Sequence, residues 1–447
     1  MTLWTSSAMT LLVPLLTEYD NVNTSEGSLD PLGLSLIADR LGTKLVPGVR
    51  ERMKHPRFLT AIAAGAFICA EFDDDRVAPD GVTPPYQVYE WYVVQALVRT
   101  FRNNTDKIMG LPGRDKATDA MQKGEPLCAQ NYLKSPSVFG FHGVYRTLAE
   151  DLDILRQGGL GEAGDRLIRI WETEQDLAGF YSWERGPGAS LRQALTNAVR
   201  DGLDRGKVDR EWTWSMNSII AEKFAPYRAK AKENKAIFTM LCEEPSSYRS
   251  QIIHFLISHE GNHLWLKKRN EKELHAALLK SASPDLRELL ECIRSYEHFA
   301  RLIQDAFDDC LWHMSRKQGK TNIKELAGLK AVNLAHKNLL EIFSKVSNQL
   351  SPYGYASEFI NGFEDLQVNG NCDTWVEQLL EHHFAVQKKK PPLGKNPWID
   401  RYDDNTYCVR PLYRRDEPAR MDDSYVHPYR TNAVWSFLTD LKRICNE

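Results

Sequence analysis

Two histidines and a glutamate near the middle of the chain have the spacing of a zinc site. Residues 259–263 read His259-Glu260-Gly261-Asn262-His263. On a helix, this spacing places the two imidazoles one turn apart, where both can bind the same zinc ion, with Glu260 beside them as the general base of a hydrolase. A third ligand is needed, and Glu291 or Glu288, on the next long helix expected from the sequence, lies at a suitable distance downstream. The motif predicts, as one alternative, a zinc-dependent hydrolase.

The same two histidines also fit a purely structural role. Gly261 and Asn262 are poor helix formers, so they weaken the helix that a zinc site needs. The segment projects the following residues onto one helix face: Ile252, Leu256, His259, His263 and Leu266. We therefore favour histidines that lie in the core with hydrogen-bond partners, and we expect neither zinc nor another cofactor to be bound.

Basic and aromatic side chains alternate in the C-terminal region. Lys388, Lys389 and Lys390 form a run that is followed by Lys395 and Trp398. The alternation continues with Arg401, Tyr407, Arg410, Tyr413, Arg414 and Arg415. Cations bind phosphates and aromatic rings stack on bases, so the run from Lys388 to Trp398 is a candidate surface for contact with DNA. The alternative is a solvated basic surface whose rings pack on the helical body.

Residues 136–175 hold a second candidate for DNA contact. Apolar residues recur at positions 144, 148, 152 and 155, which predicts a helix, and two glycines separate it from a second helix. A helix, a short Gly-containing connection and a helix that opens with G-x-x-L-I resemble the recognition helix and final helix of winged helix-turn-helix domains. The resemblance implies that Tyr145 and Arg146 reach DNA from the major groove. Because Glu150 and Asp151 on the same helix repel phosphate, a plain helical hairpin is the alternative.

Helical periodicity dominates the rest of the chain, and alternating patterns typical of strands are scarce. The spacing predicts helices over 57–71, 86–101, 246–268, 284–314, 322–350, 373–388 and 431–444, and a short strand over 406–410. The helices over 284–314 and 322–350 are separated by a short turn, which predicts a long helical hairpin. We therefore expect a mainly α fold: a multi-helical body with this hairpin, the winged-helix-like segment and an irregular C-terminal region with few strands.

We divide the chain into four parts at stretches that contain proline and glycine. Residues 1–135 form an N-terminal helical domain, and residues 136–185 form the winged-helix-like segment. A helical bundle that contains the long hairpin covers residues 186–390. The irregular basic and aromatic region, with a closing helix, covers residues 391–447.

The composition is that of a globular protein and restricts its class. Of 447 residues, 42% are hydrophobic, and 57 basic against 60 acidic side chains give a net charge of -3. This balance excludes a protein with a wholly basic surface but allows a local basic face. No apolar stretch reaches the roughly 20 residues that span a bilayer, no signal peptide is expected around the apolar run 11–16, and the 8 scattered cysteines suit reduced thiols. We expect a cytoplasmic protein with no membrane partner.

Residues 32–65 contain a Leu-Gly opening, a turn at Leu45-Val46-Pro47-Gly48, and Pro56-Arg57-Phe58 leading into an apolar helix. This run resembles the start of uncharacterised bacterial proteins that are often encoded beside restriction or anti-phage genes. The resemblance implies a bacterial origin and a role in antiviral defence or DNA modification. Together with the basic regions, it favours a non-enzymatic DNA-associated subunit that binds DNA and other protein subunits. The alternatives are the zinc-dependent hydrolase and a helical protein-protein scaffold.

Overall fold

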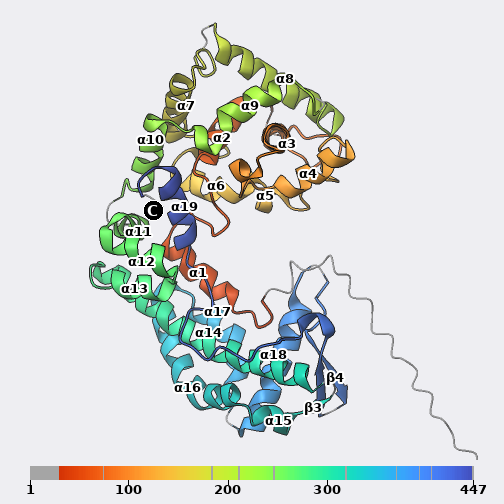
Figure 1. Cartoon of the computed structure of the whole chain (residues 1–447), viewed down its shortest axis with the longest axis vertical. Coiled ribbons are helices and arrows are strands. Elements are labelled where there is room, and N and C mark those ends of the chain that lie inside the picture. The colour runs from red at the N-terminus through yellow and green to blue at the C-terminus, as the bar shows by residue number, and fades with distance from the viewer. Residues whose placement is uncertain are drawn as a thin grey trace, which may run out of the picture. The chain divides into compact units, whose positions relative to one another are not determined.

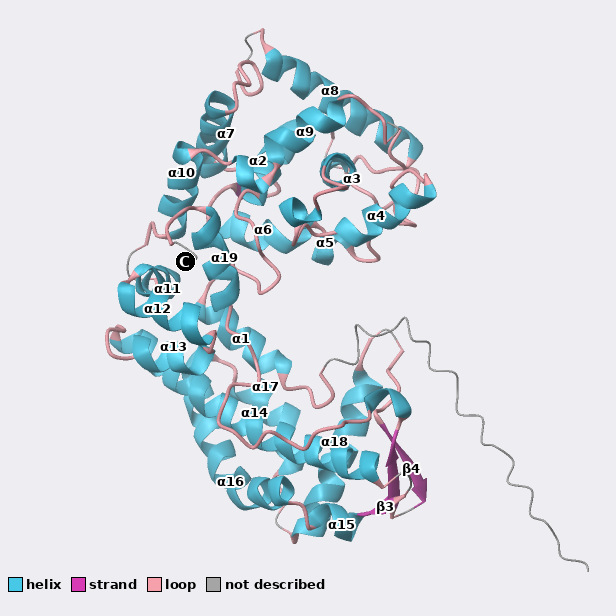
Figure 2. Ribbon diagram, viewed as in Figure 1, coloured by secondary structure: helices cyan, strands magenta, loops and turns pink. Residues whose placement is uncertain are grey.

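The computed structural model describes residues 30–444 except 74, 183–184, 210–211, 245–246, 318–319, 369, 392 and 404. The apolar run at 11–16 lies outside these residues. Within the described part, 63% of the structure is helical, with 19 α-helices and 4% strand (Figures 1 and 2). The predicted mainly α fold is therefore confirmed. Among these helices, none combines the length and the apolar character needed to cross a membrane.

The chain forms two compact units, which divide it differently from the four parts suggested by the sequence. Unit 1 contains the described residues up to Leu36 and residues Phe299–Asp423, and unit 2 contains Ile37–His298 and the described residues from Ser424 onward. The longest helix, α14 (Pro284–Arg316), begins in unit 2 and ends in unit 1. The N-terminal and C-terminal segments of the chain thus each contribute to a unit formed mainly by residues distant in sequence.

Unit 2 is built around helix α3, which is apolar over most of its circumference. Its residues 87–98 are all buried, and it packs against α2, α8 and α9. Gly65 of α2 allows one of these close approaches, because a Cβ atom there would lie 2.6 Å from the ring of Tyr89. The helices of this unit are α1 (Ser35–Leu45), α2 (Phe58–Cys69), α3 (Pro85–Thr100), α4 (Arg114–Lys123), α5 (Pro136–Phe139), α6 (Phe141–Asp151), α7 (Glu162–Glu174), α8 (Pro187–Arg205), α9 (Met216–Phe224), α10 (Ala231–Leu241), α11 (Tyr248–Ile257), α12 (His259–Lys268), α13 (Glu271–Leu278) and α19 (Thr431–Asp440).

The winged-helix-like segment contains a shorter helix than the sequence predicts. Helix α6 ends at Asp151, and the chain then forms an antiparallel hairpin of β1 (Leu155–Arg156) and β2 (Gly159–Leu160) before α7. Asp153 has a φ of 54°, which the right-handed helix does not allow, so the apolar spacing does not extend the helix to Leu155. Gln157 and Gly158 also have positive φ values, as the tight two-residue turn between the strands requires.

Unit 1 contains the predicted helical hairpin. Helix α14 begins at Pro284, where Ser283 Oγ accepts a hydrogen bond from the Leu286 amide, and it packs on α16 through the rings of Phe299 and Phe343, whose centroids are 6.0 Å apart. The second long helix begins at Lys330 rather than Asn322, because a short helix, α15, occupies the start of the predicted span. The helices of this unit besides α14 are α15 (Ile323–Ala327), α16 (Lys330–Leu350), α17 (Ala356–Phe363) and α18 (Cys372–Lys389).

A small antiparallel sheet completes unit 1. It has the order β3-β5-β4, with β3 (Thr321–Asn322), β4 (Ile399–Asp403) and β5 (Thr406–Val409), and Figure 2 shows its strands in magenta. The predicted strand over 406–410 corresponds to β5. The chain then forms a short 3-10 turn at Pro411–Tyr413 and continues to Asp423 without helix or strand. Arg415 and Ala419 of this irregular segment are hydrogen-bonded to side chains of α14.

Candidate functional site

The predicted lysine run has two exposed members and two that are engaged by the fold. Lys388 and Lys389 are exposed at the C-terminal end of α18. Lys390 donates a hydrogen bond of 2.7 Å from Nζ to the carbonyl oxygen of Asp30, and partial burial lowers its pKa. Lys395 is half-buried. Lys388 and Lys389 therefore remain candidates for phosphate contact, whereas Lys390 is held within unit 1.

Trp398 packs on the helical body, which is the alternative that the sequence left open. Its ring is stacked on Tyr413, with centroids 4.7 Å apart and an interplanar angle of 4°. Its backbone amide donates to Nε2 of His383 at 2.9 Å, and its ring also lies near Phe307. Because Tyr413 covers one face of the indole, that face is closed to a nucleic-acid base.

Tyr145 does not reach the surface, so its predicted contact with DNA is wrong. Its side chain is completely buried, and its hydroxyl accepts hydrogen bonds of 2.9 Å from the amides of Lys54 and His55. The buried face of α6 is wider than its apolar stripe and includes Tyr145 and Ala149. Arg146 is exposed but pairs with Glu150 at 2.8 Å.

His259 and His263 lie on the surface, which corrects the expectation that they are core residues. Their rings are parallel with centroids 6.2 Å apart, and Glu260 lies 3.6 Å from Nζ of Lys280. Ser258 has extended backbone angles, ends α11 and caps α12 by accepting a hydrogen bond from the Gly261 amide. This break changes the helical phase, so the histidines do not continue the buried face of α11.

The structure does not bring the predicted zinc ligands together. Glu291 is exposed on α14, and among the described residues no group of three His, Cys, Asp or Glu side chains is arranged to hold a metal ion. His259 and His263 are therefore two exposed imidazoles with no third protein ligand in the described part of the chain.

Unit 1 contains a pocket that the sequence did not reveal. It has a volume of about 650 Å³. Its lining comes from the last turn of α14 and from the irregular segment that follows the 3-10 turn: Trp312, Ser315, Arg316, Arg414, Arg415, Asp416 and Pro418. The guanidinium of Arg316 lies 5.0 Å from the ring centroid of Trp312, which is a cation-π contact. Three arginines and one tryptophan thus line one open pocket.

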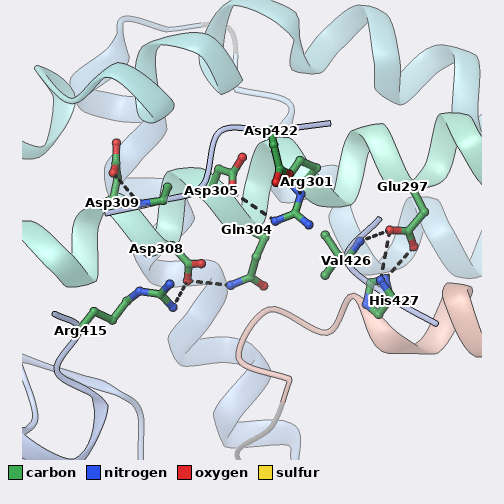
Figure 3. Close-up of polar contacts among 11 residues, drawn as sticks. Glu297, Arg301, Gln304, Asp305, Asp308, Asp309, Arg415, Asp422, Val426 and His427 are labelled. Carbon is green, nitrogen blue, oxygen red and sulfur yellow. Dashed lines mark hydrogen bonds and ion pairs between the residues drawn. The ribbon is translucent and has the colours of Figure 1, made fainter. Parts of the chain in front are cut away.

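Buried side chains of α14 fix the irregular wall of this pocket (Figure 3). Asp308 accepts hydrogen bonds from Gln304 at 2.8 Å and from Arg415 at 2.9 Å, and Ser315 Oγ accepts from the Arg415 amide at 2.9 Å. Two anchors therefore hold Arg415, one on its guanidinium and one on its backbone. The wall is thus attached to α14 at Arg415 although it contains no helix or strand.

Asp309 anchors the far end of the same wall. Its two carboxylate oxygens accept from the backbone amides of Ala419, at 3.2 Å, and of Ala331, at 3.3 Å. Ala331 lies in the first turn of α16, where the positive end of the helix dipole favours a carboxylate. One buried side chain thus joins the pocket wall to the start of α16.

The charges around the pocket leave an excess of positive charge. Asp308 neutralises Arg415, and burial raises the pKa of Asp308 while that arginine opposes the rise. Arg316 and Arg414 are exposed and make no ion pair with another described residue, and Asp416 is the single carboxylate in the lining. Two available guanidinium groups against one carboxylate suit a ligand with several negative charges.

The pocket combines residues that are far apart in sequence. Arg414 and Arg415 belong to the interleaved basic and aromatic run of the C-terminal region. Trp312 and Arg316 lie at the end of a long helix and are not part of a recognisable binding motif. The one available signal is the four-residue spacing of Trp312 and Arg316, which places both on one helix face. Comparison with family models, curated proteins and solved structures finds no match to this chain.

Proposed function

We propose that this protein binds nucleic acid without catalysing a reaction on it, through the arginine-lined pocket of unit 1. The observation that carries the proposal is the pair of exposed arginines, Arg316 and Arg414, beside a wall that buried hydrogen bonds hold in place. A planar guanidinium can bind a phosphate through two parallel hydrogen bonds, which is why arginine is common at phosphate-binding sites. Attachment of the wall to α14 reduces the entropy lost on binding.

The open form of the pocket and its mixed lining favour a polymer over a small phosphate. A nucleic acid presents repeated phosphates, so it can contact Arg316 and Arg414 at the same time and release condensed counterions from both sites. Lys388 and Lys389, exposed in the same unit, add positive charge for non-specific attraction. Trp312 is half-buried under Arg316 and supports that arginine.

The biological setting that we propose is a DNA-directed complex of a bacterial defence or modification system, in which this chain is a subunit. It depends on the resemblance of residues 32–65. The zinc-dependent hydrolase receives no support from the geometry, because Glu291 and the two histidines do not form a site.

The proposal is tested by fluorescence anisotropy with a labelled DNA duplex at low salt. We expect the double variant Arg316→Gln/Arg414→Gln to bind the duplex about tenfold more weakly than the wild type, because it loses two phosphate contacts. The matched control is Lys388→Gln/Lys389→Gln, which removes the same charge from flexible side chains of the same unit. All four positions are exposed, so both variants should keep the fold.

Two results contradict the proposal. One is the absence of duplex binding by the wild type at low salt. The other is an equal loss of affinity in the two variants, which would show that only net charge matters and that the pocket has no special role.

A further inference from the structure

His55 connects two segments of unit 2 that are distant from it in sequence. Its Nδ1 atom lies 2.6 Å from a carboxylate oxygen of Asp440, the last residue of α19, and its Nε2 atom lies 2.7 Å from the carbonyl oxygen of Met109. The side chains of His55 and Asp440 are both partly buried. One imidazole ring therefore joins the end of α19 to the loop that follows the 3-10 turn Thr105–Ile108.

The two contacts together require a positively charged histidine. A carboxylate and a backbone carbonyl both accept hydrogen bonds, so each nitrogen of the His55 ring must be the donor. A neutral imidazole has one N–H group, whereas the imidazolium has two. The geometry thus selects the imidazolium, and its contact with Asp440 is an ion pair as well as a hydrogen bond.

The groups around the ring decide how firmly His55 keeps its second proton. Burial lowers the pKa of His55, and the charge of Lys54 acts in the same direction. The hydrogen bond to Asp440, the charge of that carboxylate and the Met109 carbonyl outweigh both effects and raise the pKa above its ordinary value of 6.5. The hydroxyl of Tyr145 on α6 accepts from the His55 amide and stays un-ionised, because burial raises its pKa. Asp440 is therefore the group that keeps the ring charged.

Asp440 needs a cation because of its place at the end of a helix. The last carbonyl groups of a helix carry partial negative charge, so a carboxylate beside them is unfavourable. The structure describes all of α19, and its last turn contains no basic residue. The imidazolium of His55 offsets this repulsion. When the ring loses one proton, its remaining N–H group can serve only one of the two oxygens, and the other nitrogen turns a lone pair towards its oxygen.

We propose that His55 is a pH-sensitive latch whose imidazolium holds the last turn of α19 closed and whose deprotonation lets that turn open. Folding raises the pKa of His55, so this stabilisation is complete below the ordinary value of 6.5 and is lost as the pH rises through the folded value. The latch is built from residues of unit 2 and does not depend on the proposed nucleic-acid binding.

The first test follows the ring of His55 by NMR of the full chain labelled with ¹⁵N-histidine, with the signal assigned by its absence in His55→Gln. We expect a pKa above 6.5 in the wild type. In Asp440→Asn the pKa should fall below 6.5, because burial and Lys54 then outweigh the Met109 carbonyl. Asp119→Asn is the matched control, since it removes the same charge from an exposed position of α4, and it should leave the pKa of His55 unchanged.

The second test measures the latch by hydrogen-exchange mass spectrometry of the peptide that contains the end of α19. The wild type and Asp440→Asn are compared at the same pH, so the effect of pH on the chemical exchange rate cancels. At a pH of about 6 the variant should exchange about tenfold faster, because it lacks a hydrogen bond between charged groups. At a pH of about 9 this difference should disappear, because the wild type has then lost the imidazolium. Asp119→Asn should match the wild type at both pH values.

The proposal is overturned if the pKa of His55 in the wild type lies at or below 6.5. It is also overturned if the exchange rates of Asp440→Asn and the wild type differ by the same factor at both pH values, because Asp440 would then act without the second proton of His55. The exchange measurement does not use His55→Gln, so it remains decisive if that variant is unstable. Circular dichroism verifies the fold of the two aspartate variants.

Discussion

Replacing Asp309 by asparagine should loosen two segments of unit 1 at once. Asp309 is 6% exposed and accepts one backbone hydrogen bond on each carboxylate oxygen, from Ala419 in the pocket wall and from Ala331 at the start of α16. Asparagine has the same shape but only one oxygen. Its NH₂ group must therefore face one of the two amides, and that amide loses its acceptor.

The size of the effect follows from these two contacts. A hydrogen bond to a charged group contributes about 1.5–3 kcal/mol, and a buried amide left without a partner costs about 1–3 kcal/mol. Small movements of the backbone relieve part of the cost of the unpartnered amide. We therefore expect Asp309→Asn to lower the free energy of local opening by about 3 kcal/mol.

Asp305→Asn is a matched control on the same helix. Asp305 is also 6% exposed, but its partner is the flexible side chain of Arg301 at 3.4 Å, and burial already raises its pKa to about 6. Because burial already disfavours the charged form of Asp305, its replacement by neutral asparagine should cost less than about 1 kcal/mol. The two substitutions are chemically identical and differ only in what the carboxylate contacts.

Hydrogen-exchange mass spectrometry measures both variants locally, which avoids the assumption of two-state unfolding for a chain of two units. In Asp309→Asn, the peptides that contain Ala331 and Ala419 should exchange about a hundredfold faster, since each 1.4 kcal/mol is a factor of ten. The same peptides should change little in Asp305→Asn. Equal acceleration in the two variants would refute the argument that the backbone contacts of Asp309 hold the pocket wall.

Two further predictions concern buried charged or titratable groups. Burial lowers the pKa of His383 to about 4, below its unfolded value of about 6.5, so stability from the neutral ring is present above pH 6.5 and is lost as the pH falls towards 4. We therefore compare the free energy of unfolding of the wild type with that of His383→Gln by urea denaturation. The difference between them should fall by about 3 kcal/mol from pH 7 to pH 4, and a difference that does not depend on pH would contradict the lowered pKa of His383. Glu233→Gln should destabilise unit 2 by about 3–5 kcal/mol, because Arg57 at 2.7 Å would remain as a buried unpaired charge. Glu222→Gln is the control, because Glu222 pairs with Arg228 on the surface, and it should change the urea midpoint very little. If Glu222→Gln and Glu233→Gln shift the urea midpoint equally, burial of the Arg57 pair is not the cause of the destabilisation.

The long helices of this protein could be predicted because their information is local. Ser283-Pro284 begins α14 as a capping residue and a first-turn proline should, and the apolar spacing continues to the end of that helix. Helix α3 is apolar on nearly all sides and lies at the centre of unit 2. In these cases one stretch of sequence contains both the periodicity and the end signals.

The pocket could not be predicted, because its position depends on contacts between distant segments. Asp308 and Asp309 belong to no motif in the sequence, yet both are buried and hold the segment that carries Arg414 and Arg415. The misplaced histidines have a different cause. Ser258 interrupts the helix for one residue, and a change of phase at a single residue leaves no mark on the average periodicity.

The dependence of duplex affinity on salt tests the central claim most directly. For B-form DNA, the slope of log K against the logarithm of the salt concentration is about -0.9 for each phosphate that the protein neutralises. If Arg316 and Arg414 each neutralise one phosphate, the slope for Arg316→Gln/Arg414→Gln should be shallower than that of the wild type by about 1.8, and the slope for Lys388→Gln/Lys389→Gln should change less. Parallel lines for the wild type and the arginine variant would show that the pocket does not contact the DNA backbone.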